Sequence, residues 1–167
     1  MDSAHFAGCS LGGLISIFFV KKYANKVKSL TISGAIPEKP EKWEQMHETD
    51  VAQQTQLLQN KEAIDLFNSM HDGDWKQFLY MVREPNWYPF DETNNLDTLE
   101  MPILFMVGEE KTYEVKGVTI YPKTNRHIHV SVIPFAGHLV HLEQPEIYTK
   151  VLEGFLNRVV EGKVDSK

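Results

Sequence analysis

The sequence contains a single cysteine, Cys9, among its 167 residues, so no disulfide bond can form within the chain. Disulfides are rare in the cytosol, and this composition favours a reducing compartment. Long hydrophobic runs are also missing, and the longest are far shorter than the roughly 20 apolar residues of a membrane-spanning helix. The start, Met1-Asp2-Ser3-Ala4, has neither the basic nor the apolar stretch of a signal peptide. We therefore expect a cytoplasmic protein.

A dense block of lysine and arginine is absent as well. The 17 basic residues are outnumbered by 23 acidic residues, which gives a formal net charge of −6 at pH 7. This balance argues against nucleic acid and against an anionic membrane surface as main partners. The length and the hydrophobic content of 42% fit one globular domain, residues 1–167, that buries its own core.

The periodicity of apolar residues predicts an α/β fold, a mostly parallel sheet flanked by helices. The run Pro102–Gly108 is continuously apolar, as expected of a parallel strand that is covered on both faces. Other strands are expected at residues 5–7, at 30–32 and at 128–133, and helices from Leu11 and from Pro145. We expect the strand at residues 5–7 to be buried. The first helix should bury the stripe of Leu11, Leu14, Ile15, Phe18 and Phe19.

The middle of the chain is polar and helical in period. One-sided apolar stripes recur from residue 64 to residue 82, and Asp74 is placed to cap a helix. No low-complexity linker isolates this stretch. We therefore expect residues 38–95 to form a helical insertion within the one domain.

The segment Gly8-Cys9-Ser10-Leu11-Gly12 has the G-x-S-x-G pattern between a short apolar run and a helix. This is the pattern of a nucleophile elbow, in which a serine stands on a sharp strand-to-helix turn. The flanking glycines give the backbone room for the turn. The backbone N–H of Leu11, at the start of the helix, is expected to be an oxyanion-hole donor.

A serine needs a base to take its proton and a third group to hold the base. His138 follows the last predicted strand, and the acidic pair Glu109 and Glu110 follows the strand at residues 102–108. This gives the order serine, acid, histidine that accompanies G-x-S-x-G. We expect Ser10 and His138 to be catalytic, with Glu110 or Glu109 as the acid.

A metal site was weighed against this interpretation. His127 and His129 fall on one face of a predicted strand, with His138 or His141 close by in sequence. No cysteine or acidic residue lies at a recognised metal-ligand spacing from them. We therefore expect no bound metal and, since triad chemistry needs none, no cofactor.

Three segments together resemble the α/β-hydrolase family: the elbow, the strand at residues 102–108, and the block Gly137-His138-Leu139-Val140-His141-Leu142-Glu143-Gln144-Pro145-Glu146. The similarity is greatest to the branch of small carboxylesterases, enol-lactonases and C–C hydrolases. It implies that Ser10 is the nucleophile, that His138 is the general base, and that the helical insertion is a lid over the acyl pocket.

Two features depart from the family. The usual position of the triad acid falls on Lys111, whose ammonium disfavours the imidazolium that the reaction must form. Glu110 lies nearer to this position than Glu109, so the resemblance implies Glu110 as the acid, with Glu109 as the alternative. The strands that precede the elbow in the family, and the oxyanion donor that they carry, have no room in nine residues. The resemblance therefore implies a C-terminal portion of the fold with a bare sheet edge, which is an association hazard.

The sequence predicts a serine hydrolase that acts on a small ester or related acyl substrate. Two alternatives stay open. One is a truncated, non-catalytic member of the family. The other is a half-enzyme that a separate N-terminal segment completes. A homo-oligomer or a complementing chain at the exposed sheet edge fits either alternative.

Overall fold

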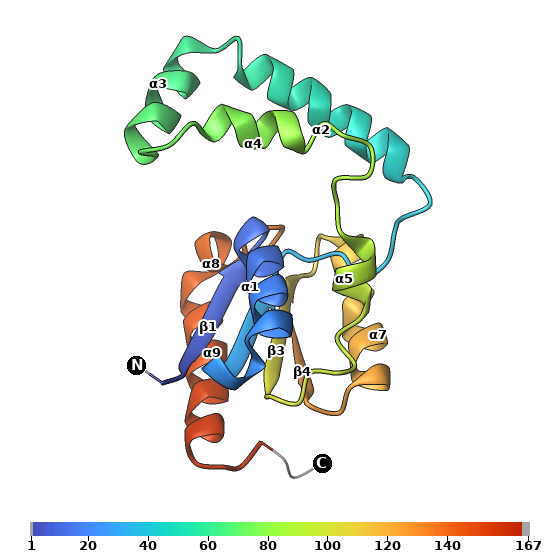
Figure 1. Cartoon of the computed structure of the whole chain (residues 1–167), viewed down its shortest axis with the longest axis vertical. Coiled ribbons are helices and arrows are strands. Elements are labelled where there is room, and N and C mark those ends of the chain that lie inside the picture. Colours follow the sequence, from blue (N-terminus) through green and yellow to red (C-terminus); the bar gives the residue numbers. More distant parts are fainter. Residues whose placement is uncertain (1, 165–167) are drawn as a thin grey trace. The chain divides into compact units, whose positions relative to one another are not determined.

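A parallel sheet forms the centre of the computed structural model, which describes residues 2–164. Its strands are β1 (Ala4–Cys9), β2 (Val27–Ser33), β3 (Ile103–Gly108) and β4 (Ile128–Ile133), and within the described residues they lie side by side in sequence order. All three strand pairings are parallel, which places every carboxyl end at the same edge (Figure 1). The predicted strands and the α/β class are confirmed.

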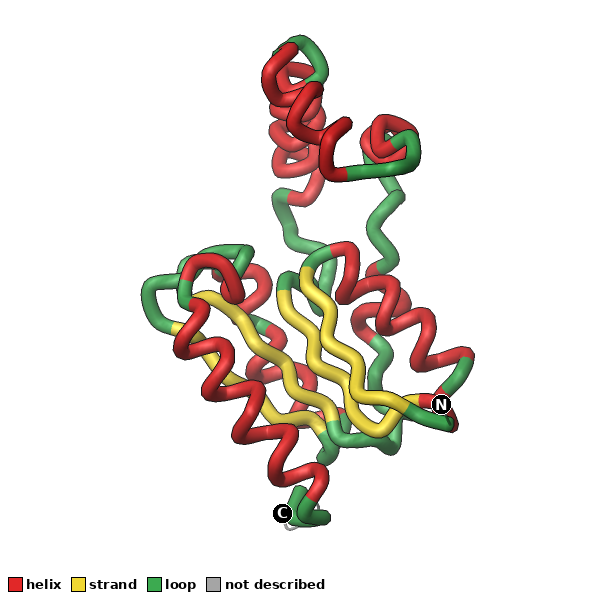
Figure 2. Tube along the Cα trace, turned by 90° about the vertical axis from the view of Figure 1, so that its left-hand side faces the viewer, coloured by secondary structure: helices red, strands yellow, loops and turns green. Residues whose placement is uncertain are grey.

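Helices cover both faces of this sheet. Helix α1 (Leu11–Lys22) lies on one face, where the rings of Phe6 and Phe19 stack with centroids 4.8 Å apart. Helix α9 (Pro145–Val160) lies on the opposite face, where Phe155 packs with Leu104 and Met106 of β3 (Figures 1 and 2). Successive side chains of a strand point to opposite faces of the sheet. β3 therefore contributes side chains to the hydrophobic core on each face, and all six of its residues are buried.

The exposure of β1, which lies at one edge of the sheet, differs from the prediction. His5 and Ala7 of β1 are exposed, although the sequence predicted a buried strand at residues 5–7. Within the described residues, β1 pairs with β2 alone, and the larger sheet contacts of α9 are with β2 and β4. The prediction failed because burial of a strand depends on its neighbours, which its own residues do not specify.

The buried stripe of α1 is also rotated from the predicted one. Leu14 is buried as expected, and Ile17 and Val20 are fully buried beside it. Ile15 and Phe18, predicted to be inside, are 68% and 47% exposed. The helix is hydrophobic around most of its circumference, so periodicity alone could not select the face that packs on the sheet.

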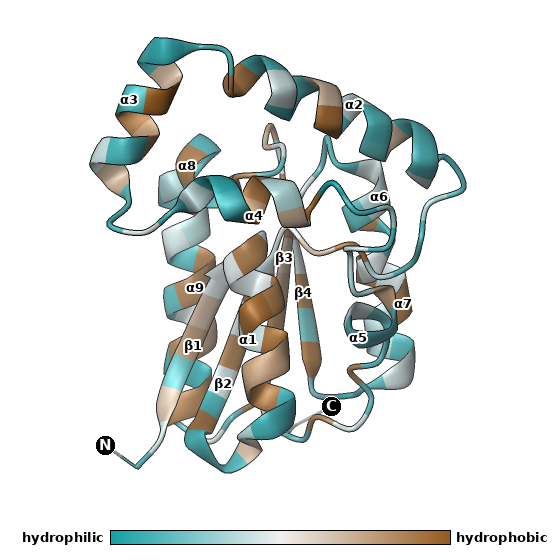
Figure 3. Cartoon of the chain, turned by 45° about the horizontal axis from the view of Figure 1, so that its top comes forward, coloured by the Kyte–Doolittle hydropathy of each residue, from teal (hydrophilic) through white to brown (hydrophobic). Residues whose placement is uncertain are grey.

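Residues 39–89 form a compact unit of their own, apart from the sheet-containing unit. It holds α2 (Trp43–Leu57), α3 (Lys61–Met70) and α4 (Trp75–Met81), and the predicted cap at Asp74 accepts a hydrogen bond from the Lys76 N–H at 3.1 Å. Figure 3 shows α2 to be largely hydrophilic, whereas hydrophobic and hydrophilic residues are mixed along α3 and α4. Helix α5 (Phe90–Asn94), within the expected insertion 38–95, belongs to the unit that holds the sheet.

Short elements complete the sheet-containing unit: η1 (Ala24–Lys26), α6 (Thr112–Val115), α7 (Gly117–Thr124) and α8 (Val140–Glu143). Tyr121 of α7 is fully buried, and its hydroxyl donates to the Thr93 carbonyl at 2.9 Å. No helix among residues 2–164 has the length and apolar character needed to cross a membrane.

Candidate active site

Ser10 stands on the sharp turn between β1 and α1, as the motif predicts. Its φ of 55° and ψ of −121° are rare for a residue with a side chain, and such strain is concentrated at functional sites. Its N–H donates to the Ser33 carbonyl at 2.9 Å, which continues the strand pairing into the turn. A Cβ at Gly8 would lie 2.3 Å from the Gly12 carbonyl oxygen, so the turn requires glycine there.

His138 hydrogen-bonds through both ring nitrogens to residues far away in the sequence. Nε2 lies 2.9 Å from Ser10 Oγ, and Nδ1 lies 2.7 Å from Glu114 Oε1. Ser10 follows β1, Glu114 follows β3 and His138 follows β4, so the three side chains meet at the carboxyl edge of the sheet. This is the connectivity of a Ser–His–acid triad.

The carboxylate that bonds to His138 is that of Glu114, whereas the sequence analysis expected Glu110 or, alternatively, Glu109. Both are exposed, and Glu109 Oε1 instead accepts the Phe135 N–H at 2.7 Å. The backbone N–H of Glu110 donates to the Ala136 carbonyl, and His138 Nδ1 bonds to Glu114 Oε1. Nearness in sequence to the family position favoured Glu110, but the turn of α6 brings the next acidic residue to the histidine.

Glu114 is enclosed, with a side chain only 6% exposed. Its N–H donates to the Lys111 carbonyl at 2.9 Å, which closes the turn that begins α6. Oε2 is buried without a hydrogen-bond partner among the described residues, so the carboxylate is directed at His138 alone. A buried carboxylate with this single partner can fix the tautomer and the orientation of the imidazole.

Gly34, which follows β2, is a site residue that the sequence analysis missed. A Cβ on Gly34 would lie 2.8 Å from His138 Cε1 and 3.0 Å from the Ser10 backbone nitrogen. Its φ of +67° is also in the left-handed region that favours glycine. The signal was present in the sequence as a glycine at a strand end, but only the sheet order places it beside Ser10 and His138.

Leu11 is the first residue of α1, as predicted. The first four N–H groups of a helix lack partners within it, and they carry its partial positive charge. The Leu11 N–H thus lies in the first turn of α1, directly after Ser10.

Cys9 precedes the serine and is half-buried, with Sγ 3.8 Å from the His138 carbonyl oxygen. Burial raises the pKa of the Cys9 thiol, the nearby Ser33 side chain partly offsets this, and the negative charge of Glu114 raises the pKa further. The thiol is therefore neutral near pH 7, which keeps its nucleophilicity low.

The histidines weighed as metal ligands are not part of a larger cluster of ligating side chains in the described part of the chain. Within residues 2–164, no group of three or more His, Cys, Asp or Glu side chains is arranged to hold a metal ion. The His129 ring instead lies 6.1 Å from the Phe155 ring, on the face covered by α9.

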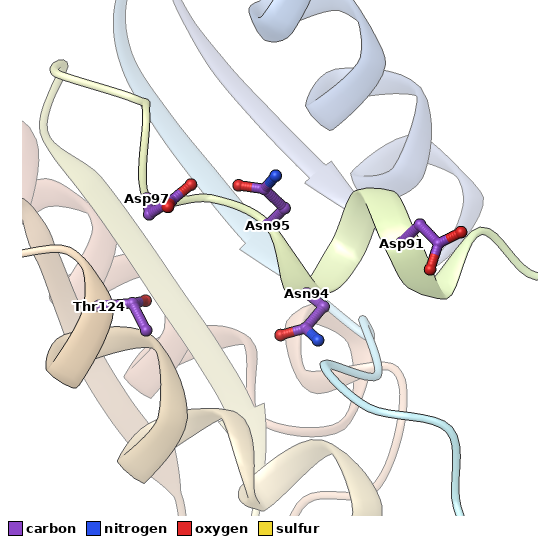
Figure 4. A pocket seen from close by; sticks show the side chains of 5 residues that line it. All are labelled: Asp91, Asn94, Asn95, Asp97 and Thr124. Carbon is purple, nitrogen blue, oxygen red and sulfur yellow. The ribbon is translucent and has the colours of Figure 1, made fainter.

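A polar hollow of about 450 Å³ lies elsewhere on the sheet-containing unit. Figure 4 shows the side chains that line it: Asp91, Asn94, Asn95, Asp97 and Thr124. It includes none of Ser10, His138 or Glu114, and every residue that lines it is polar or acidic.

The sequence matches no protein-family model, and no curated protein matches it. Solved structures, in contrast, match almost the whole chain. NosK from Streptomyces actuosus is 22% identical with a TM-score of 0.78, over 94% of this chain and 70% of that one. The meta-cleavage product hydrolase CumD from Pseudomonas fluorescens IP01 is 20% identical with a TM-score of 0.67, over 94% and 65%.

Carboxylesterase CesB from Bacillus subtilis is 18% identical with a TM-score of 0.60, over 93% of this chain and 60% of that one. These neighbours are α/β-hydrolases, and this chain spans between about 60% and 70% of their lengths. The sheet, its flanking helices and these matches together identify the fold of this chain as a partial α/β-hydrolase fold.

Proposed function

We propose that the protein is a serine hydrolase that acts on a small ester or related acyl substrate. The observation that carries the proposal is the continuous connection from Ser10 Oγ to His138 Nε2 at 2.9 Å and from His138 Nδ1 to Glu114 Oε1 at 2.7 Å. A serine in a strained strand-to-helix turn, a histidine and a buried carboxylate are the parts that acyl transfer requires.

Each residue has a defined part in the proposed reaction. His138 Nε2 accepts the proton of Ser10 while Oγ attacks the carbonyl carbon, and it then delivers that proton to the leaving group. Glu114 holds the Nδ1–H tautomer and stabilises the imidazolium. Water, activated by His138 in the same way, then releases the acyl group from Ser10.

The Leu11 N–H, in the first turn of α1, is the proposed oxyanion donor at the elbow. Removing one donor from an oxyanion hole costs on the order of 10²–10³ in kcat. The substrate class of a small ester or other acyl compound is consistent with neighbours that are described as esterases and as a meta-cleavage product hydrolase.

A fluorophosphonate probe tests the nucleophile directly. We expect the native chain to be labelled and to hydrolyse p-nitrophenyl acetate, and Ser10→Ala to lose both properties. Ser69→Ala, which changes an exposed serine of α3, is the matched control and should retain both. Equal labelling of Ser10→Ala, or no labelling of folded native chain, would refute the proposal.

A second candidate is an association module, or a half-enzyme that is completed by a separate segment. It is favoured by the position of β1 at the sheet edge, where His5 and Ala7 are exposed and β2 is the one described strand that pairs with it. Association without any Ser10 labelling would favour the module. Labelling that appears only on association would favour the half-enzyme.

A further inference from the structure

The backbone of the loop that carries His138 is bound by the carboxylate of Glu143, which is not part of the Ser10–His138–Glu114 set. The Gly137 N–H donates to Glu143 Oε2 at 2.7 Å, and the Leu139 N–H donates to Glu143 Oε1 at 2.9 Å. Glu143 therefore binds the backbone on both sides of His138 and uses both of its oxygens. Bonds of this length between an N–H and an ionised carboxylate are stronger than neutral ones.

The ionised form of Glu143 is favoured by these contacts. The Gly137 N–H and then the Leu139 N–H hold the pKa of the Glu143 carboxyl below its ordinary value of 4.5, against a small opposing effect of burial. The positive charge of Lys111 and the nearby His138 side chain act in the same direction. Near pH 7 the group is therefore a carboxylate, which can accept both amide hydrogens.

The bond from the Leu139 N–H to Glu143 is an ordinary contact at the start of a helix, whereas the bond from the Gly137 N–H is not. Leu139 is the N-cap of α8, and a glutamate near the start of a helix often accepts its cap N–H. Gly137 lies outside the helix, on the other side of His138. A Cβ there would come within 3.1 Å of Glu143 Oε2, so glycine allows the carboxylate to approach.

The loop is also confined from the side of β3. A Cβ on Gly108 would lie 2.1 Å from the Gly137 carbonyl oxygen, which shows how closely the loop lies against the end of that strand. The backbone around His138 is thus set between the strand end and the Glu143 carboxylate. The imidazole must reach Ser10 and Glu114 at once, and its position depends on this backbone.

We propose that Glu143 is a positioning residue, whose carboxylate fixes the backbone on both sides of His138 so that the ring meets Ser10 and Glu114 together. This inference rests on the proposed serine hydrolase function. A misplacement of about 1 Å can cost 10²-fold in rate. The effect should therefore fall on kcat more than on KM.

The test compares Glu143→Gln with Glu153→Gln, an exposed position of α9 that undergoes the same charge change. Glutamine keeps the shape of glutamate but has one acceptor oxygen, so at least one of the two loop bonds is lost. We expect kcat for p-nitrophenyl acetate to fall by about 10- to 100-fold in Glu143→Gln, with KM changed by less than about 3-fold. Glu153→Gln should match the native chain.

A second readout does not depend on turnover. The proton between His138 Nδ1 and Glu114 should give a downfield NMR signal in the native chain. The same signal is expected in Glu143→Asp and in Glu153→Gln. In Glu143→Gln the signal should be broadened or lost. A native-like signal in Glu143→Gln would overturn the inference, whether or not the native chain hydrolyses esters. An intact native signal without hydrolysis or Ser10 labelling would refute the proposed function alone.

Discussion

Residues with unusual backbone angles mark the candidate site. Ser10 and Phe135 are the non-glycine residues with positive φ in the described part of the chain, at 55° and 56°. One is the proposed nucleophile, and the other begins the loop that leads to His138. Each such residue costs about 1–3 kcal/mol and persists only where its surroundings hold it. The Phe135 N–H and carbonyl are both bonded, to Glu109 and to Gln144.

The identity of the acid is tested by exchanging each carboxylate for an amide. Glu114→Gln should lower kcat for p-nitrophenyl acetate by about 10²–10⁴, because an amide permits the wrong histidine tautomer. Glu110→Gln and Glu109→Gln should each retain most of the native rate, since neither side chain contacts His138. A larger loss in Glu110→Gln than in Glu114→Gln would contradict this assignment.

Gly34 should tolerate no side chain. We expect Gly34→Ala to lower kcat by at least about 10²-fold, because the new methyl would displace His138 Cε1 from a position only 2.8 Å away. The positive φ should also lower the free energy of unfolding by about 1–2 kcal/mol. Gly154→Ala in α9, where a Cβ meets no atom within 4 Å, serves as the control in urea unfolding and kinetics. Native kinetics in Gly34→Ala would show that the site can relax around the methyl group.

At the scale of elements, the strand-to-helix motif was the most predictable part of the site. Glycines at fixed spacing and a helix beginning at Leu11 are local features, and the structure has both. The acid was harder to predict because it depends on a turn. Lys111 to Val115 fold back into α6, and this carries Glu114 to the histidine while Glu110 stays exposed.

The loop between β4 and α8 should give stability a defined pH dependence. Since the pKa of Glu143 is lowered in the folded state, its contribution is present above about pH 4.5 and is lost as the pH falls through the folded-state pKa. The difference in free energy of unfolding between the native chain and Glu143→Gln should therefore be larger at pH 7 than at pH 3.

Urea unfolding at the two pH values measures this difference. Glu153→Gln, an exposed carboxylate without a bond to the loop, should show little change between them. A Glu143→Gln difference that stays constant from pH 7 to pH 3 would mean that ionisation of Glu143 does not contribute to stability.

At the scale of the whole molecule, the sheet edge at β1 should govern association. An exposed strand edge is a template for pairing with another chain. We expect the average mass in sedimentation velocity to rise with protein concentration. Ala7→Lys on β1 should reduce this association, because a charge on an edge strand opposes pairing.

The control for charge is Thr119→Lys, at an exposed position of α7, which should associate like the native chain. A monomer at every concentration would contradict the prediction, as would equal effects of the two lysine substitutions.

The sequence by itself determined the class of the fold, the place of the elbow and the histidine, and the continuously buried β3. These properties follow from local patterns: a glycine-flanked serine, an apolar run and residue periodicity. Tertiary structure decided which carboxylate meets His138, that Gly34 lies against Ser10 and His138, and which side of α1 is buried. The physical reason is that each of these depends on the order of parallel strands, which brings together residues separated by tens of positions in the chain.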